Sequence, residues 1–152
     1  MTIAAVVVAL VIVGAYFFTD GFHFSSGSKP TVLVQAGTSY PIPGLQFNAI
    51  AINVQKTSMI SGTFTNTEGI TLYTMTPSEL LSLSKTGVVG TYDWTSGRIA
   101  NLTVTNLDLS FQPGGWDLVF YNTNGPTPYP LTFPNYNTTY IGFYTDLTLS
   151  SG

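Results

Sequence analysis

Hydrophobic and polar positions divide the chain into two parts with different periodicities. Residues 1–18 are almost continuously apolar and carry no charged side chain. From residue 31 onward, apolar residues alternate with Thr, Ser and Asn, as they do in half-buried strands. Residues 19–30 contain Gly, Ser and Pro without periodicity, which is typical of a linker. The pattern predicts an apolar N-terminal helix at 1–18, a linker at 19–30 and a β-domain at 31–152.

The apolar segment from Ile3 to Ala15 has no polar face. A helix of this kind must lie in lipid or among other apolar helices. At ~1.5 Å per residue, a helix over residues 2–18 spans roughly 25 Å, slightly less than the ~30 Å hydrocarbon core of a bilayer. If the helix packs against copies of itself, we expect assembly contacts from Ile3, Val6, Val7, Leu10, Val11, Ile12, Gly14, Tyr16, Phe17 and Phe18.

Four interpretations of this segment remain open: a filament core, a single membrane anchor, a removed secretory signal, or a strand donated to a neighbouring subunit. A secretory signal has a basic n-region, and an anchor is oriented by positive charges. No Lys or Arg precedes Lys29, which favours the filament core. The many β-branched residues favour strands and keep strand donation open. A donated strand would present Val6, Val8, Leu10 and Ile12 on one face.

The β-domain pattern predicts short strands separated by turns. We expect strands at 31–35, 50–54, 60–64, 70–75, 88–94, 102–111, 116–121 and 138–149. Pro41 and Pro43 indicate a turn at 37–44, and the prolines of 122–137 indicate a long loop with at most an edge strand at 129–133. Leu102 and Val104 differ in phase from Leu107, which predicts a bulge near residues 105–106.

One helix is predicted inside this domain. Thr76, Pro77 and Glu79 occupy the N-cap, first and third helical positions of a capping box, and the helix should end near Lys85. Seven or more strands with a single helix indicate a mainly β fold. The fold class that we predict is an antiparallel β-sandwich, Ig-like or jelly-roll-like, joined to the long apolar N-terminal helix.

Composition narrows the classes of function. Only 7% of residues are charged, against a typical ~25%, whereas 44% are hydrophobic, so the surface must be covered by uncharged polar residues. Such a surface titrates little with pH, which suits acidic surroundings. The formal charge of −3 argues against a nucleic-acid partner. The chain has no cysteine, which excludes disulfides and thiolate metal sites.

Residues able to carry out chemistry are few. His23 is the one histidine and lies in the linker. Asp93, Asp108, Asp117 and Asp146 could act together only if the fold paired two of them; otherwise they are solvated strand or turn residues. No calcium loop, phosphate-binding loop or zinc spacing is present. We expect no enzyme activity and no cofactor or metal.

Two features point to glycans. The sequons Asn101-Leu102-Thr103 and Asn137-Thr138-Thr139 make Asn101 and Asn137 candidate glycosylation sites. The chain also has nine tyrosines, whose exposed rings can cover subunit contacts or stack on surface glycans.

The apolar stretch Thr-Ile-Ala-Ala-Val-Val-Val-Ala-Leu-Val-Ile-Val-Gly-Ala, joined to a Thr/Tyr-rich β-domain, resembles archaeal type IV pilins and the related archaeal flagellins. About 20 residues carry this resemblance, and the segment is shorter than the helix of such pilins. A further stretch of about 60 residues, 61–122, is similar to β-sandwich modules of archaeal surface proteins, and residues 61–64, 70–79 and 112–122 carry that resemblance.

The resemblance to pilins implies that a basic leader is removed, that the apolar helices bundle and that the β-domains face outward. We therefore expect an extracellular structural subunit that has a membrane-bound stage before it assembles into a helical homo-oligomer. Adhesion is an additional role that outward-facing domains would allow. The alternative is an exported surface domain that acts as a binding module.

Overall fold

The computed structural model describes residues 29–124 and 138–151, and their fold is mainly β with one short helix. The apolar segment, all ten expected assembly residues, His23, Asn137 and the expected edge strand at 129–133 lie outside the described residues. The strands are β1 (Thr31–Val34), β2 (Ser39–Ile42), β3 (Phe47–Val54), β4 (Ser58–Asn66), β5 (Ile70–Met75), β6 (Trp94–Ile99), β7 (Val104–Phe111), β8 (Gly114–Tyr121), β9 (Thr139–Phe143) and β10 (Leu147–Ser151). The helix is α2 (Pro77–Thr86).

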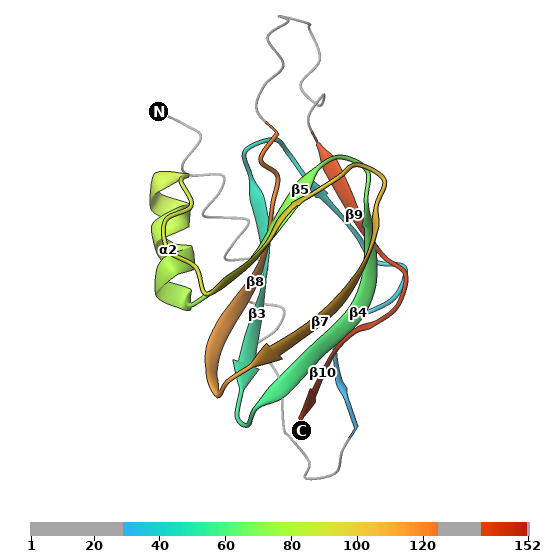
Figure 1. Ribbon diagram of the computed structural model, residues 1–152, viewed down its shortest axis with the longest axis vertical. Coiled ribbons are helices and arrows are strands. Elements are labelled where there is room, and N and C mark those ends of the chain that lie inside the picture. Colours follow the sequence, from blue (N-terminus) through green and yellow to red (C-terminus); the bar gives the residue numbers. More distant parts are fainter. Residues whose placement is uncertain (1–28, 125–137, 152) are drawn as a thin grey trace, which may run out of the picture.

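The strands form two curled antiparallel sheets (Figure 1). In the first sheet β4 pairs with β7 along one side, and with β10 and then β9 along the other. β1 pairs with β10, and β2 pairs with β9. The second sheet has the order β3-β8-β5-β6. The single strand predicted at 138–149 is thus wrong: the chain leaves the ladder at residues 144–146, and β9 and β10 are separate strands that lie end to end beside β4.

The inner faces of both sheets share one hydrophobic core. Phe64 of β4 is fully buried, and its ring meets the ring of Phe120 from β8 edge-on at 5.4 Å between centroids. Phe143 of β9 packs against both rings, at 6.2 Å from Phe64 and 5.9 Å from Phe120. Because aromatic pairs in these geometries add to the free energy gained by burial, this trio joins the two sheets.

The helix α2 covers part of the outer face of the second sheet. Leu80 and Leu83 of α2 form a second buried cluster with Met75, Val119 and Tyr121 of the sheet. The predicted capping box is present at Thr76 and Glu79, and Gly87 ends the helix in the left-handed conformation. The capping signals in the sequence therefore located this helix correctly.

Several predicted strands are confirmed. Ile50, Ile52 and Val54 are buried and alternate with exposed residues in β3. Ile60 and Phe64 lie on one buried face of β4. β8 is a central strand between β3 and β5. Inward positions of the C-terminal strands are also as expected, namely Ile141, Phe143, Leu147 and Leu149.

Besides the C-terminal strand, three predicted segments are wrong. The expected turn at 37–44 contains β2, where Pro41 is tolerated because β2 lies at the edge of its sheet. The expected strand at 88–94 is mostly irregular, since β6 begins only at Trp94. The strand expected from residue 102 begins at Val104 and keeps an unbroken register with β4, without a bulge at 105–106.

The last error has a physical cause. Leu102 has a φ of 54° and turns the chain between β6 and β7, with 78% of its surface exposed. The buried residues Leu107 and Phe111 then set the phase of β7. Val104 is consequently placed on the outer face, where it is 59% exposed.

Candidate functional site

The outer face of the first sheet carries an open polar depression of about 450 Å³. Strand alternation brings hydroxyl, amide and carboxylate side chains to this face, while their neighbours in sequence enter the core. The depression is lined by residues of β4, β7 and β10, and by the connection between β9 and β10. Its polar lining residues are Ser61, Thr63, Asn106, Asp108, Thr145, Asp146 and Thr148.

The connection between β9 and β10 shapes one side of the depression. The amides of Tyr144 and Thr145 both donate to the Thr63 carbonyl, at 2.9 and 3.4 Å. The Thr63 amide donates in return to Thr145 Oγ1 at 2.8 Å. One carboxylate oxygen of Asp146 accepts a hydrogen bond from the Ala36 amide at 2.7 Å. These bonds hold the connection against β4 and β1 where the regular ladder is interrupted.

Gly62 permits this close approach. A Cβ atom at Gly62 would lie 3.0 Å from the Asp146 carbonyl oxygen and 3.1 Å from the Leu147 Cα atom. Both neighbours are backbone atoms, so a side chain here would push β10 away from β4. The absence of a side chain at Gly62 therefore allows the start of β10 to lie close to β4 at this side of the depression.

Some polar side chains of the depression are held by hydrogen bonds and still have donors or acceptors that are not used. Thr63 Oγ1 donates to Asn106 Oδ1 at 2.9 Å, and this bond leaves the Asn106 amide nitrogen unused. Within the described residues, neither that nitrogen nor the exposed Asp108 carboxylate has a hydrogen-bonding partner. The depression thus offers a donor and acceptors together.

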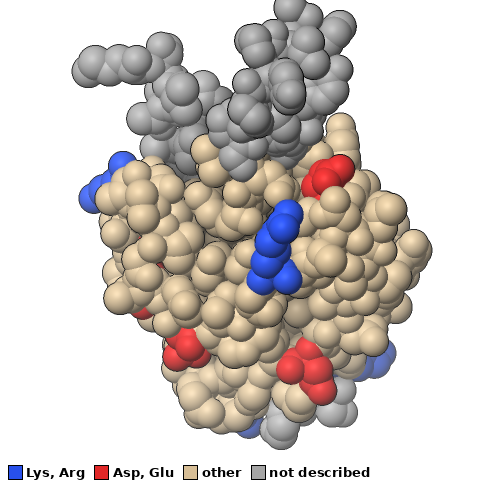
Figure 2. Space-filling view, turned by 45° about the horizontal axis from the view of Figure 1, so that its top comes forward, with Lys and Arg blue, Asp and Glu red and all other residues tan. Residues whose placement is uncertain are grey.

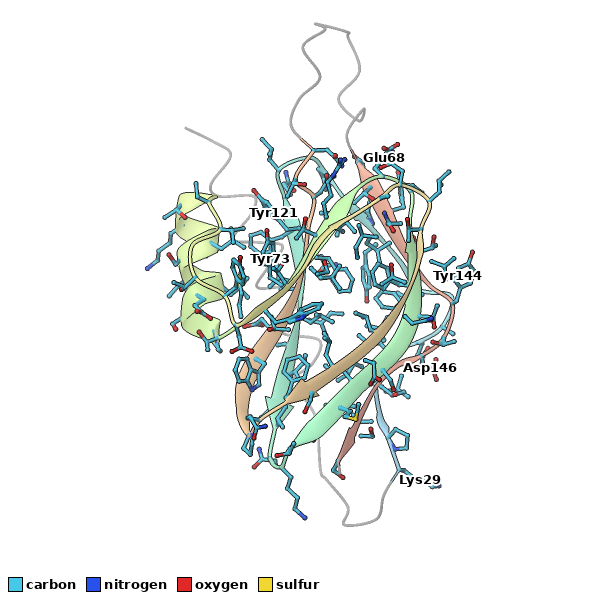
Figure 3. The ribbon with its side chains drawn as sticks, in the orientation of Figure 1. Lys29, Glu68, Tyr73, Tyr121, Tyr144 and Asp146 are labelled. Carbon is cyan, nitrogen blue, oxygen red and sulfur yellow. The ribbon has the colours of Figure 1, made fainter. Side chains whose placement is uncertain are left out.

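Two tyrosines of β9 and its following connection lie on the same face. Tyr144 is 65% exposed and Tyr140 is 51% exposed. Figure 3 labels Tyr144 and Asp146 on the outer side of the β9–β10 connection. Tyr144 directly precedes Thr145, which lines the depression, and its amide donates to the carbonyl of Thr63, a second lining residue, so Tyr144 flanks the depression.

Charge is sparse on this protein, and the depression is acidic. Figure 2 shows isolated basic and acidic side chains separated by uncharged surface. Asp108 and Asp146 line the depression, and none of its lining residues is Lys or Arg. A neutral or cationic ligand is therefore favoured over an anionic one.

A second unusual acid, Asp117, lies away from the depression. It is 5% exposed and faces outward from β8, between Ala51 of β3 and Met75 of β5. Burial raises the pKa of its carboxyl from 3.8 to about 6. The described residues contain no group of three His, Cys, Asp or Glu side chains that could hold a metal. Within the described residues, Asp117 is therefore a buried acid that belongs to no such group.

The sequon at Asn101 lies in the exposed turn between β6 and β7. The Asn101 side-chain amide donates to Glu68 Oε2 at 2.9 Å, and Thr103 Oγ1 donates to the Asn101 carbonyl at 3.4 Å. Asn101 is exposed, and Leu102 projects from the turn beside it. The turn presents the sequon at the surface.

Sequence reasoning considered Asp108 and Asp146 but missed Thr63, Asn106 and Thr145 as their neighbours. These residues come from three separate segments and join only through strand pairing. A glycine inside a strand often marks a close backbone approach, so Gly62 was the available signal.

No family model matches this chain, and no curated protein matches its sequence. Its function must therefore be inferred from its own chemistry. Within the described residues, no helix has both the length and the apolar character needed to cross a membrane.

Proposed function

We propose that the protein is a structural subunit of an extracellular, pilus-like filament. The apolar segments of many copies would pack together as helices in the filament core, and the β-domains would face outward. Before assembly the segment would lie in a membrane. The observation that supports this proposal best is an uncharged apolar stretch, Ile3–Ala15, attached to a β-domain with its own filled core.

The core of the β-domain is already filled by the domain's own side chains, so it does not need the apolar segment. The two sheets bury Ile60, Phe64 and Leu118 completely between them, and α2 covers a second cluster on the outside. We infer that the sheets form a closed sandwich of the Ig-like or jelly-roll-like kind. The apolar segment must then be buried elsewhere, because each large aliphatic side chain gains roughly 1.5–3 kcal/mol on burial.

The composition of the segment suits packing between helices. Small residues permit close approach of helix backbones, and the segment has five of them: Ala4, Ala5, Ala9, Gly14 and Ala15. Gly and Ser residues between 19 and 30 would let each outer domain adjust to its neighbours.

A charge in the segment tests this proposal. In the full-length protein, Val8→Asp should abolish filaments in the sheared extracellular fraction, because a buried carboxylate without a partner is costly. Val8→Ala is the matched control and should still assemble. Circular dichroism should show the same β-rich domain in both variants. Normal filaments from Val8→Asp would refute a helical core.

The alternatives give different results in native material. An anchored surface domain would stay with membranes until detergent is added, and a removed signal would give a mature N-terminus near Ser28. Strand donation would be indicated if filaments tolerated Val7→Asp but not Val8→Asp, because alternate residues of a strand face opposite sides.

A further inference from the structure

We propose that the depression beside Tyr144 binds a neutral oligosaccharide of hexopyranose units. Asn106, Asp108 and Asp146 line the site, and Thr63 holds the Asn106 side chain by a hydrogen bond. The exposed Tyr144, whose amide is bonded to Thr63, flanks the site. It would act as an adhesive or receptor site on the outer face of the domain. This binding does not require the chain to polymerise.

The hydrogen-bonding groups match the hydroxyls of a sugar. Each sugar hydroxyl donates one hydrogen bond and accepts others. A protein site for two neighbouring hydroxyls therefore needs hydrogen-bond acceptors next to a donor. The Asp108 carboxylate accepts, and the amide nitrogen of Asn106 donates from two residues away on the same strand face. Asp146 has a second carboxylate oxygen besides the one bonded to Ala36. Bonds to carboxylates are stronger than those between neutral groups, which favours hydroxyl ligands at an exposed site.

The site is organised before a ligand arrives. Thr63 Oγ1 donates to the Asn106 side chain, Thr145 Oγ1 accepts from the Thr63 amide of β4, and Asp146 accepts from the amide of Ala36, two residues after β1. Groups that are already held lose little conformational entropy when a ligand binds. This property matters for sugars, because each of their hydroxyls must also give up hydrogen bonds to water.

The Tyr144 ring supplies the apolar contact that a pyranose needs. One face of a pyranose carries C–H groups, which pack well on the face of an aromatic ring. Tyr144 is 65% exposed, so its ring is open to a ligand. Its position beside a polar depression gives the mixture of ring stacking and hydrogen bonding that a saccharide requires.

The charge of the site defines the ligand class further. Asp108 and Asp146 repel anions, and none of the residues lining the depression is basic. Acidic polysaccharides and phosphate-containing ligands are thus disfavoured. A protein partner is also less suitable, because interfaces between proteins are anchored by buried apolar and aromatic residues, whereas this lining is mainly Ser, Thr, Asn and Asp.

The experiment is a binding measurement on the full-length protein. Saturation-transfer NMR with cellotriose, maltotriose and mannotriose should show contact with at least one of them, and trigalacturonic acid should show none. Asp108→Asn should weaken binding by about tenfold, since a charged acceptor is lost. Tyr144→Ala should also weaken binding, whereas Tyr144→Phe should retain it because the ring remains.

A matched control is available in Asp93→Asn. Asp93 is an exposed acid on the connection between α2 and β6, and its replacement should leave binding unchanged. Thermal melting confirms that each variant is folded. The proposal is overturned if none of the three neutral trisaccharides binds, or if binding is equal in the wild type, Asp108→Asn and Tyr144→Ala. Filament yield is scored separately, so a failure of assembly is distinguishable from a failure of sugar binding.

Discussion

Thr76 and Glu79 hydrogen-bond to each other at the start of α2. The Thr76 amide donates to Glu79 Oε2 at 2.8 Å, and the Glu79 amide donates to Thr76 Oγ1 at 3.4 Å. Two backbone donors that the first helical turn leaves free are thereby satisfied. The pair fixes the point at which the chain leaves β5 and enters the helix over the second sheet.

Removal of this cap should destabilise the domain modestly. Thr76→Ala should lower the free energy of unfolding by about 1 kcal/mol, and Thr76→Ser should cost less because its hydroxyl can still accept. The backbone hydrogen bond from Thr76 holds the pKa of Glu79 below its usual 4.5. The stabilisation of the folded domain by ionised Glu79 is therefore fully present above pH 4.5, and it is lost as the pH falls through the lower pKa of Glu79 in the folded state. Urea unfolding at neutral and acidic pH measures both effects; an unchanged midpoint for Thr76→Ala would contradict them.

Asp117 should produce the opposite pH dependence. Burial raises the pKa of its carboxyl from 3.8 to about 6, so folding favours the protonated form. Below pH 3.8 its ionisation costs nothing, whereas the penalty grows as the pH rises to 6 and reaches roughly 3 kcal/mol above that value. Asp117→Asn should therefore raise the free energy of unfolding at pH 7 by up to roughly 3 kcal/mol, reduced by the cost of burying the new amide. At pH 3 the free energy of unfolding should change little.

The matched control for Asp117→Asn is Asp93→Asn, which alters an exposed acid and should have little effect at either pH. Chemical denaturation across this pH range tests the comparison. Equal free energies of unfolding for the wild type and Asp117→Asn at pH 7 would show that ionisation of the buried carboxyl does not destabilise the domain.

A side chain at Gly62 should disturb the pairing of β4 with the C-terminal strands. The new Cβ atom of Gly62→Ala would meet backbone atoms of Asp146 and Leu147 at 3.0 and 3.1 Å. Overpacking of this kind costs about 1–3 kcal/mol. Gly90→Ala is the control, since no atom lies within 4 Å of its added Cβ. Gly62→Ala should melt at a lower temperature than Gly90→Ala. Equal melting temperatures for the two variants would refute the tight contact at Gly62.

The sequence predicted those helices and strands correctly whose position depends on a local pattern of residues. Capping residues located α2, and alternation located Ile50, Ile52 and Val54 in the core. Prediction failed where a neighbouring strand decided the outcome. Pro41 appeared to exclude a strand, but pairing with β9 at a sheet edge accommodates it.

The candidate site was less predictable than the fold. Its residues lie on β4, on β7 and near residue 145, and no local pattern specifies which strands pair. The connection after β9 also preserves the odd-numbered inward phase from Phe143 to Leu147, so alternation gave no sign of the interruption. Only Gly62 indicated a close approach at this point.

Glycosylation at Asn101 remains a prediction that mass spectrometry can test. Asn101 is exposed in a turn, and its side-chain amide is bound only to Glu68 in the described residues, so release of the amide breaks one exposed hydrogen bond. Protein from its native source should therefore carry a glycan mass on the Asn101 peptide, if it is exported past a glycosylation enzyme. Thr103→Val should abolish the added mass, because the sequon needs a hydroxyl at that position, while Thr103→Ser should retain it. An unmodified Asn101 peptide from secreted protein, or a glycan that survives Thr103→Val, would show that this turn is not a glycosylation site.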